Sequence, residues 1–165
     1  MTFRITGLPP EHFQNLLGLS DGALAERGAC RVVADAKPGF PDRVTLRDAE
    51  IGEQLLLLNY MHQPAANPYR ASHAIFVLED AHTAYDQVGE IPEVMRSRVM
   101  SLRAFDEQDV MVDAELAQGP ELEGVIERLL GDPRVRYLQA HYAKRGCYAA
   151  RIESARSCEP ARRCP

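Results

Sequence analysis

Hydrophobic positions in this chain recur mostly with a period of two or in short continuous runs, and both patterns are typical of β-strands. In residues 110–116, Val, Val, Ala and Leu alternate with Met, Asp and Glu, which predicts a half-buried strand. The four consecutive leucines at 55–58 predict a central strand that is covered on both faces. Further strands are predicted at residues 3–8, 29–36, 43–46, 73–79 and 98–106, and in a hairpin at 135–153.

A helical pattern is confined to three segments. Residues 119–133 carry an apolar stripe at helical spacing, with acidic residues near the start, a proline in the first turn and Gly131 at the end. Residues 20–28 predict a short helix with Ser20 as its N-cap and a glycine as its stop. Residues 9–19 also place apolar side chains at helical spacing after a proline.

These elements together predict an α+β fold with a mostly antiparallel sheet and two or three helices packed on it. The chain has 165 residues, which suits one domain with a hydrophobic core. We expect residues 1–154 to form this single globular domain. Residues 155–165, which end in ARRCP, are expected to form a flexible basic tail.

Composition and charge exclude several classes of function. The formal net charge is −5 and the domain has no long basic stripe, so nucleic acid is not an expected partner. The longest apolar run is too short to span a bilayer and no signal peptide is visible, so we expect a cytoplasmic protein that does not act on membranes. No glycine-rich phosphate loop is present, and no cofactor is expected.

Three motifs carry a resemblance to a known family: DAKPGFP before Asp42 and Arg43, LRDAEIGEQLLLLN at residues 46–59, and HYAKRGCYAAR at residues 141–151. Over residues 3–153 the chain resembles a bacterial family known only as domain of unknown function 1203. The family has no established reaction, so the resemblance implies a grouping without a mechanism. Asp42 stands where the family usually has cysteine, and Tyr142 where it usually has asparagine. A carboxylate does not replace a thiolate as a soft nucleophile, so thiol chemistry at position 42 is not expected here.

Two loops present candidate binding groups at strand ends, where functional side chains are often placed. After the PGFP turn, Arg43 is suited to bind a carboxylate and Asp42 to act as a base, or the two form a surface ion pair. In the segment NPYRASH, Tyr69 and Arg70 are suited to orient an anion, and His73 to carry a proton near neutral pH. The alternative is that these three side chains only pack or pair locally.

The register of the last hairpin decides whether a cysteine and a histidine can cooperate. A four-residue turn at 143–146 pairs His141 with Tyr148 and points His141 and Cys147 to opposite faces. A five-residue turn that begins at Tyr142 instead sets His141 opposite Cys147 and permits a nucleophile pair. Four-residue turns are at least as common, so a structural Cys147 is favoured.

Two alternatives remain for other histidine and arginine positions. His62, His73 and His141 match a zinc site in number, but their spacing follows no recurrent ligand motif, so no metal is predicted. Arg103 lies inside a predicted strand, where it either enters a pocket or reaches an acidic group.

We therefore expect a small cytoplasmic enzyme that acts on a small anionic metabolite by acid/base proton transfer, as an isomerase, lyase or cyclase without a cofactor. The rival hypothesis is a non-catalytic ligand-binding or protein-interaction module, and a homodimer is left open. The predicted catalytic residues are His73, His141 and Asp42. The predicted substrate-binding residues are Arg43, Tyr69, Arg70, Arg103 and Tyr148.

Overall fold

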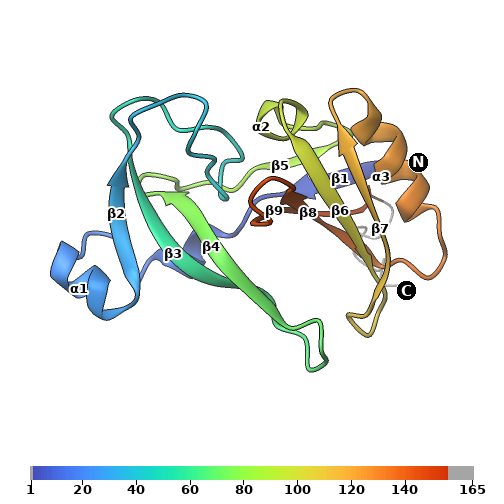
Figure 1. The fold of residues 1–165 in the computed structure, drawn as a ribbon, viewed down its shortest axis with the longest axis horizontal. Coiled ribbons are helices and arrows are strands. Elements are labelled where there is room, and N and C mark those ends of the chain that lie inside the picture. The colour runs from blue at the N-terminus through green and yellow to red at the C-terminus, as the bar shows by residue number, and fades with distance from the viewer. Residues whose placement is uncertain (1, 156–165) are drawn as a thin grey trace, which may run out of the picture.

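The computed structural model describes residues 2–155, which form two antiparallel sheets (Figure 1). The larger sheet has the strand order β5 (Asp86–Val88), β1 (Phe3–Thr6), β9 (Tyr148–Ser154), β8 (Tyr137–Tyr142), β6 (Val99–Phe105) and β7 (Met111–Gln118). The smaller sheet has the order β2 (Ala29–Val33), β3 (Gln54–Gln63) and β4 (Ala71–Leu78). The helical elements are the 3-10 turn η1 (Pro10–Phe13), α1 (Asp21–Glu26), α2 (Glu93–Arg96) and α3 (Glu121–Leu130). The predicted α+β fold is confirmed.

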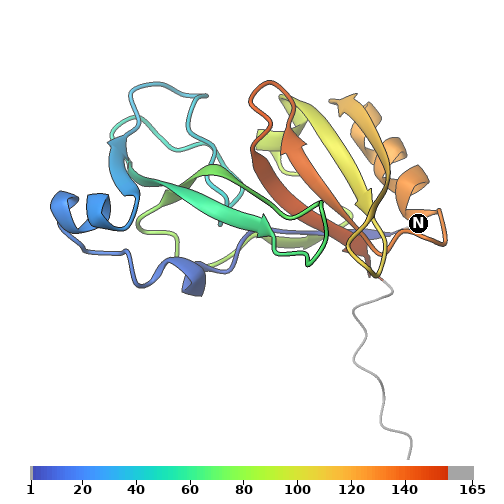
Figure 2. The same ribbon diagram turned by 60° about the horizontal axis from the view of Figure 1, so that its bottom comes forward.

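Strand β8 lies at the centre of the molecule because both of its faces are covered. Leu138 and Ala140 belong to the main hydrophobic core, which α3 covers. The alternating side chains of Gln139 and His141 face the smaller sheet, where both lie close to His62 of β3. Figure 2 shows α3 on one side of the larger sheet and the smaller sheet on the other. All six residues of β8 are buried, although its sequence alternates apolar and polar side chains.

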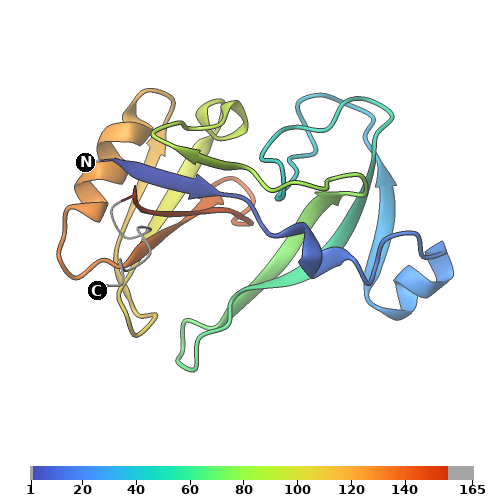
Figure 3. The same cartoon turned by 180° about the vertical axis from the view of Figure 1, so that it is seen from behind.

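Two chain crossings connect the sheets. Behind the molecule, the chain leaves β1 towards η1, and the segment before β5 returns beside it (Figure 3). Gly7 N donates to Tyr85 O at 2.8 Å, and Tyr85 N donates to Val44 O at the same distance. The two crossings are therefore tied to each other and to the loop that contains Val44.

Three predictions about the elements are corrected by the structure. Residues 43–46 are a loop rather than a strand, and residues 9–19 form only the short turn η1. Strand β7 exists, but the side chain of Leu116 is 64% exposed. The opposite face of β7, with Asp113 and Glu115, turns towards α3, because both carboxylates pair with Arg128.

The turn between β8 and β9 has the four-residue form. Tyr142 N donates to Cys147 O at 2.9 Å, Gly146 N donates to Tyr142 O at 2.7 Å, and His141 pairs with Tyr148. Gly146 has a φ of +75°, which glycine adopts without strain. Cys147 joins the main core, whereas His141 faces the smaller sheet. The five-residue alternative, which would have paired these two residues, is wrong.

The predicted tail at residues 155–165 lies, beyond residue 155, outside the described part of the chain. Within that part, the helices are all too short or too polar to cross a membrane.

Candidate functional site

Arg43 sits on a loop whose backbone is held from both sides. Its N–H donates to Phe76 O in β4 at 3.2 Å, and its carbonyl oxygen accepts from Leu8 N at 2.7 Å. A Cβ atom added at Gly7 would lie only 2.0 Å from Val44 O, so the chain crossing after β1 packs directly against this loop. The position of Arg43 is therefore set by both sheets.

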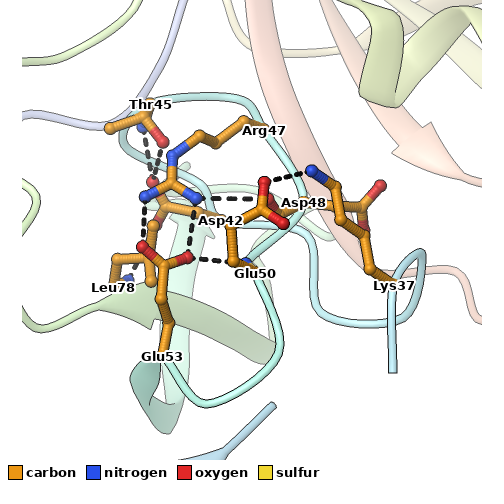
Figure 4. A network of polar contacts seen from close by, with 8 residues as sticks. All are labelled: Lys37, Asp42, Thr45, Arg47, Asp48, Glu50, Glu53 and Leu78. Carbon is orange, nitrogen blue, oxygen red and sulfur yellow. Dashed lines mark hydrogen bonds and ion pairs between the residues drawn. The ribbon is translucent and has the colours of Figure 1, made fainter. Parts of the chain in front are cut away.

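The carboxylate of Asp42 closes the same loop from inside (Figure 4). It accepts hydrogen bonds from Thr45 N and Thr45 Oγ1, both at 2.6 Å, and from Leu78 N at 2.9 Å. Asp42 is fully buried, and none of these partners is a histidine. The carboxylate therefore has a structural role: it holds the backbone of the loop and so the position of the next residue, Arg43.

An outer layer of ion pairs supports the loop (Figure 4). Arg47 makes a bidentate contact with Glu53, with both N–O distances at 2.7 Å. This hydrogen bonding lowers the pKa of Glu53 to about 2. Lys37 also pairs with Glu50, so the loop is anchored on its exposed side as well.

The guanidinium of Arg43 is buried without a carboxylate partner. The residue is 1% exposed. Its Nε donates to Tyr148 O at 2.8 Å, one terminal nitrogen donates to Pro41 O, and the other lies 3.1 Å from Cys147 Sγ. Within residues 2–155, all of its hydrogen-bond partners are neutral groups. Buried charges are normally paired, so a buried guanidinium without an ion-pair partner in the described part of the chain is unusual.

Arg43 lines a pocket of about 420 Å³, which we call the basic pocket. Its other cationic side chains are Arg98, Lys144 and Arg145, and no acidic residue is among the described residues that line it. Arg98 pairs with Asp48 at 2.7 Å, whereas the exposed Lys144 and Arg145 have no ion-pair partner within residues 2–155. The apolar part of the wall comes from Pro38, Pro41, Phe76 and Val99.

Tyr142 lines the basic pocket and has a buried hydroxyl group. The guanidinium carbons of Arg43 and Arg98 lie over its ring, at 5.0 and 5.5 Å from the ring centroid. Its hydroxyl is the single buried side-chain N or O atom in the described part of the chain that lacks a hydrogen-bond partner. Burial raises the pKa of Tyr142 to about 12, so the hydroxyl keeps its proton at neutral pH. It is therefore a free hydrogen-bond donor.

A second polar group lies between the two sheets. Gln139 Oε1 lies 2.9 Å from His62 Nδ1 and 3.2 Å from His141 Nε2. The His62 ring stacks on Tyr148 with centroids 5.4 Å apart, and it meets the His141 ring edge-on at 4.9 Å. His141 Nδ1 is also 3.1 Å from the carbonyl oxygen of Gly146.

Burial keeps both histidines of this group neutral. Burial, and then the positive charge of Arg103, lower the pKa of His141 to about 3. Burial also lowers the pKa of His62, with smaller contributions from Arg103 and His73. At neutral pH, both imidazoles are therefore uncharged. His62 is the more accessible of the two, because it is only partly buried while His141 is 0% exposed.

His62 also lines a pocket of about 620 Å³, which we call the inter-sheet pocket. Its walls include η1, Tyr60, Gln139, Tyr148 and Arg151. His12 Nδ1 lies 2.9 Å from the Tyr60 hydroxyl and orders one side of this pocket.

The remaining predicted site residues are more exposed. Tyr69 packs edge-on against Phe105, and Arg70 donates to Pro64 O at 3.3 Å at the end of the β3–β4 hairpin. His73 Nδ1 lies 3.1 Å from the carbonyl oxygen of Ala74. Arg103 Nε lies 3.5 Å from Ser101 Oγ, and burial lowers the pKa of the Arg103 guanidinium.

The structure thus does not bring the predicted residues together in one site. Arg43 belongs to the basic pocket, while His141 and the ring of Tyr148 belong to the inter-sheet group, within electrostatic reach of His73 and Arg103. Asp42 supports the loop, and Tyr69 and Arg70 lie on the hairpin.

The predicted site residues did not include Tyr142 and Arg98 of the basic pocket or Gln139 of the inter-sheet group. The period of two in β8 places Tyr142 on the face opposite to Gln139, which is a signal present in the sequence. Arg98 has no such signal, because its position depends on the pairing with Asp48. Within residues 2–155, no group of three or more His, Cys, Asp or Glu side chains is arranged to hold a metal ion, so the three-histidine metal alternative is not supported.

Comparison with known proteins assigns the chain to a family. A family model described as protein of unknown function DUF1203 matches residues 39–154, which is more than half of the chain. The chain belongs to the DUF1203 family. The match includes the loop with Arg43, the β8–β9 turn and all of β3 to β9, so both pockets draw on DUF1203 residues. No curated protein and no solved structure matches the chain.

Proposed function

We propose that this DUF1203 protein binds a small organic anion in the basic pocket. The observation that carries the proposal is the buried guanidinium of Arg43, whose described hydrogen-bond partners are all neutral. Burying a charge without an ion-pair partner costs several kcal/mol. A carboxylate or phosphate group from a ligand supplies the missing partner and recovers part of this cost.

The rest of the pocket fits the same class of ligand. Lys144 and Arg145 lie exposed on the wall and attract an anion from solution. Phe76, Val99 and the prolines offer an apolar surface, which favours an anion that also has an apolar part. The Tyr142 hydroxyl supplies a donor for a ligand oxygen. A volume of about 420 Å³ suits a small metabolite.

We place this function in the cytoplasm and without a cofactor. Cys30 and Cys147 are both free thiols, and a reducing compartment keeps them so. The net charge of −5 makes nucleic acid a poor partner for the protein as a whole, although the basic pocket itself is cationic.

The test is calorimetric titration with benzoate, with neutral benzamide as its isostere, and with inorganic phosphate. We expect benzoate to bind more tightly than benzamide, and the affinity to fall with added salt. The double variant Lys144→Gln/Arg145→Gln removes two exposed charges and should weaken benzoate binding about tenfold. Arg134→Gln is the matched control, because Arg134 is an exposed arginine outside the basic pocket, and it should leave the affinity unchanged.

Absence of binding by benzoate and phosphate at millimolar concentration would contradict the proposal. Equal binding of benzoate and benzamide would contradict it too, since the charge would then contribute nothing.

A second candidate function is acid/base catalysis on a small anionic metabolite in the inter-sheet pocket, as an isomerase, lyase or cyclase. The observation that favours it is His62, a neutral imidazole with a lowered pKa that lines this pocket next to His141. A neutral imidazole accepts a proton. The test is turnover of a panel of small carboxylates by the protein and by His62→Gln. Equal rates for both would eliminate His62 as the base.

A further inference from the structure

We infer that Cys147 is a reactive thiol that selects small, negatively charged electrophiles. The inference rests on the proposed anion binding, because Cys147 lies in the wall of the basic pocket. In this arrangement the cationic side chains hold the anionic end of a molecule while the sulfur attacks its electrophilic carbon.

The hairpin register points Cys147 into this environment. The residue is 6% exposed, and its Sγ accepts a hydrogen bond from Arg43 at 3.1 Å. A guanidinium therefore lies directly against the sulfur, where it stabilises negative charge in the transition state of the attack. Arg43 is suited to this task because no carboxylate among its described contacts neutralises it.

His141 does not take part in this activation. It lies on the other face of the hairpin, where its Nδ1 faces Gly146 O and its Nε2 faces Gln139. The thiol proton therefore passes to water rather than to an imidazole. Activation by Arg43 replaces the cysteine–histidine pair that a different register would have formed.

The Tyr142 hydroxyl is an independent observation that points to a ligand at the same place. Tyr142 is 5% exposed, lines the basic pocket and has a buried hydroxyl without a partner in the described part of the chain. A ligand oxygen held by this donor and by the cations would leave an adjacent carbon available to Cys147. The S–C bond forms as the leaving group departs with its electron pair, so no oxidant or reductant is needed.

The experiment compares carboxymethylation by iodoacetate with carbamidomethylation by neutral iodoacetamide, followed by peptide mapping. In both reactions an S–C bond forms and iodide leaves. Cys30 is the internal control, because it is an exposed free thiol on β2. We expect the ratio of the iodoacetate rate to the iodoacetamide rate to be about tenfold larger at Cys147 than at Cys30. Such a difference is what we expect when the reagent's carboxylate pairs with one cationic side chain. The Lys144→Gln/Arg145→Gln variant should lower this ratio at Cys147 alone, and added benzoate should slow Cys147 alone.

Several outcomes would overturn the inference. Cys147 that resists both reagents while Cys30 reacts is not a reactive thiol, and equal rate ratios at the two cysteines remove the charge selectivity. Calorimetric titration with benzoate distinguishes failure of the reactive thiol from failure of the proposed anion binding. Benzoate binding with an inert Cys147 overturns only the inference, whereas charge-selective alkylation without benzoate binding supports the thiol and counts against the proposed function.

Discussion

Tyr142 has a buried hydroxyl group that lacks a hydrogen-bond partner within residues 2–155. A buried hydroxyl without a partner carries a desolvation cost of about 1–3 kcal/mol. The ring itself is well placed, since it packs in the main core and contacts the guanidinium groups of Arg43 and Arg98. Any desolvation cost therefore comes from the hydroxyl oxygen and not from the ring, and the proposed ligand would remove this cost by accepting the hydrogen bond.

We predict that Tyr142→Phe stabilises the ligand-free protein by about 1 kcal/mol and weakens benzoate binding roughly tenfold. The measurements are denaturant unfolding and calorimetry. Tyr137→Phe is the matched control, because the Tyr137 hydroxyl is bonded to Gln63 and Asp109. That variant should lose stability by about 1 kcal/mol. A destabilised Tyr142→Phe protein would show that the hydroxyl has a partner after all.

His141 predicts a pH dependence of stability. Its pKa is lowered from 6.5 to about 3 in the folded protein, so the unfolded chain binds this proton more readily. The free energy of unfolding should therefore fall as the pH drops from 6.5 towards 3, and His141 should contribute no slope above that range. At roughly 1.4 kcal/mol per pH unit, the full effect is on the order of 5 kcal/mol.

The measurement is the free energy of unfolding of the protein and of His141→Gln as a function of pH. The variant should have a shallower slope below pH 6.5, before the carboxylates titrate. Identical slopes would contradict a buried, neutral His141.

At the scale of elements, the loop that carries Arg43 matters most. Its residues 43–46 have the β-branched composition of a strand, yet they form a loop because the Asp42 carboxylate bonds Thr45 and Leu78. Local propensity is a weak prior, and here tertiary contacts override it. The same contacts hold the backbone of the loop that carries the buried guanidinium of Arg43.

We predict that Asp42→Ala destabilises the protein by about 3 kcal/mol, because it leaves buried N–H groups of Thr45 and Leu78 without acceptors. Asp35→Ala is the control, since Asp35 is exposed, and it should change stability by less than about 0.5 kcal/mol. Unfolding by denaturant measures both. A small loss for Asp42→Ala would mean that the loop does not depend on the carboxylate.

The crossing at Gly7 offers a second prediction at this scale. A Cβ atom there would lie 2.0 Å from Val44 O, so Gly7→Ala must displace the backbone beside Arg43. We expect a loss of about 2 kcal/mol or more in stability and weaker benzoate binding. Gly124→Ala is the matched control: nothing lies near that position in α3, and it should stabilise by about 0.5–1 kcal/mol. Equal effects of the two substitutions would be inconsistent with a tight crossing.

At the scale of the whole molecule, the sequence predicted the fold class and most elements, because periodicity and caps are local. Helix α3 begins after Pro120 and ends before Gly131, and α1 has Ser20 as its cap, as expected. The division into two sheets was not predicted, since it depends on which strands pair. The sequence also did not identify β8 as the central strand. Its polar residues Gln139 and His141 suggest one exposed face, but both are buried.

The basic pocket could not be assembled from the sequence for the same reason. It joins the loop around Arg43, the segment around Arg98 and the β8–β9 turn, which are far apart in the chain. Arg43 was predicted to bind an anion, and the cations near Cys147 were visible in the sequence. Their convergence required the hairpin register and the crossing at Gly7, neither of which a local pattern determines.

The most direct test of anion binding in the basic pocket is a titration of the ¹⁵N-labelled protein with benzoate, followed by amide chemical shifts. The proposal predicts that saturable shift changes concentrate in the loop around Arg43, at Phe76 and in the turn from Tyr142 to Cys147. Benzamide at the same concentration should produce much smaller changes. Changes that centre on His62 in the inter-sheet pocket, or the absence of any saturable change, would contradict the account.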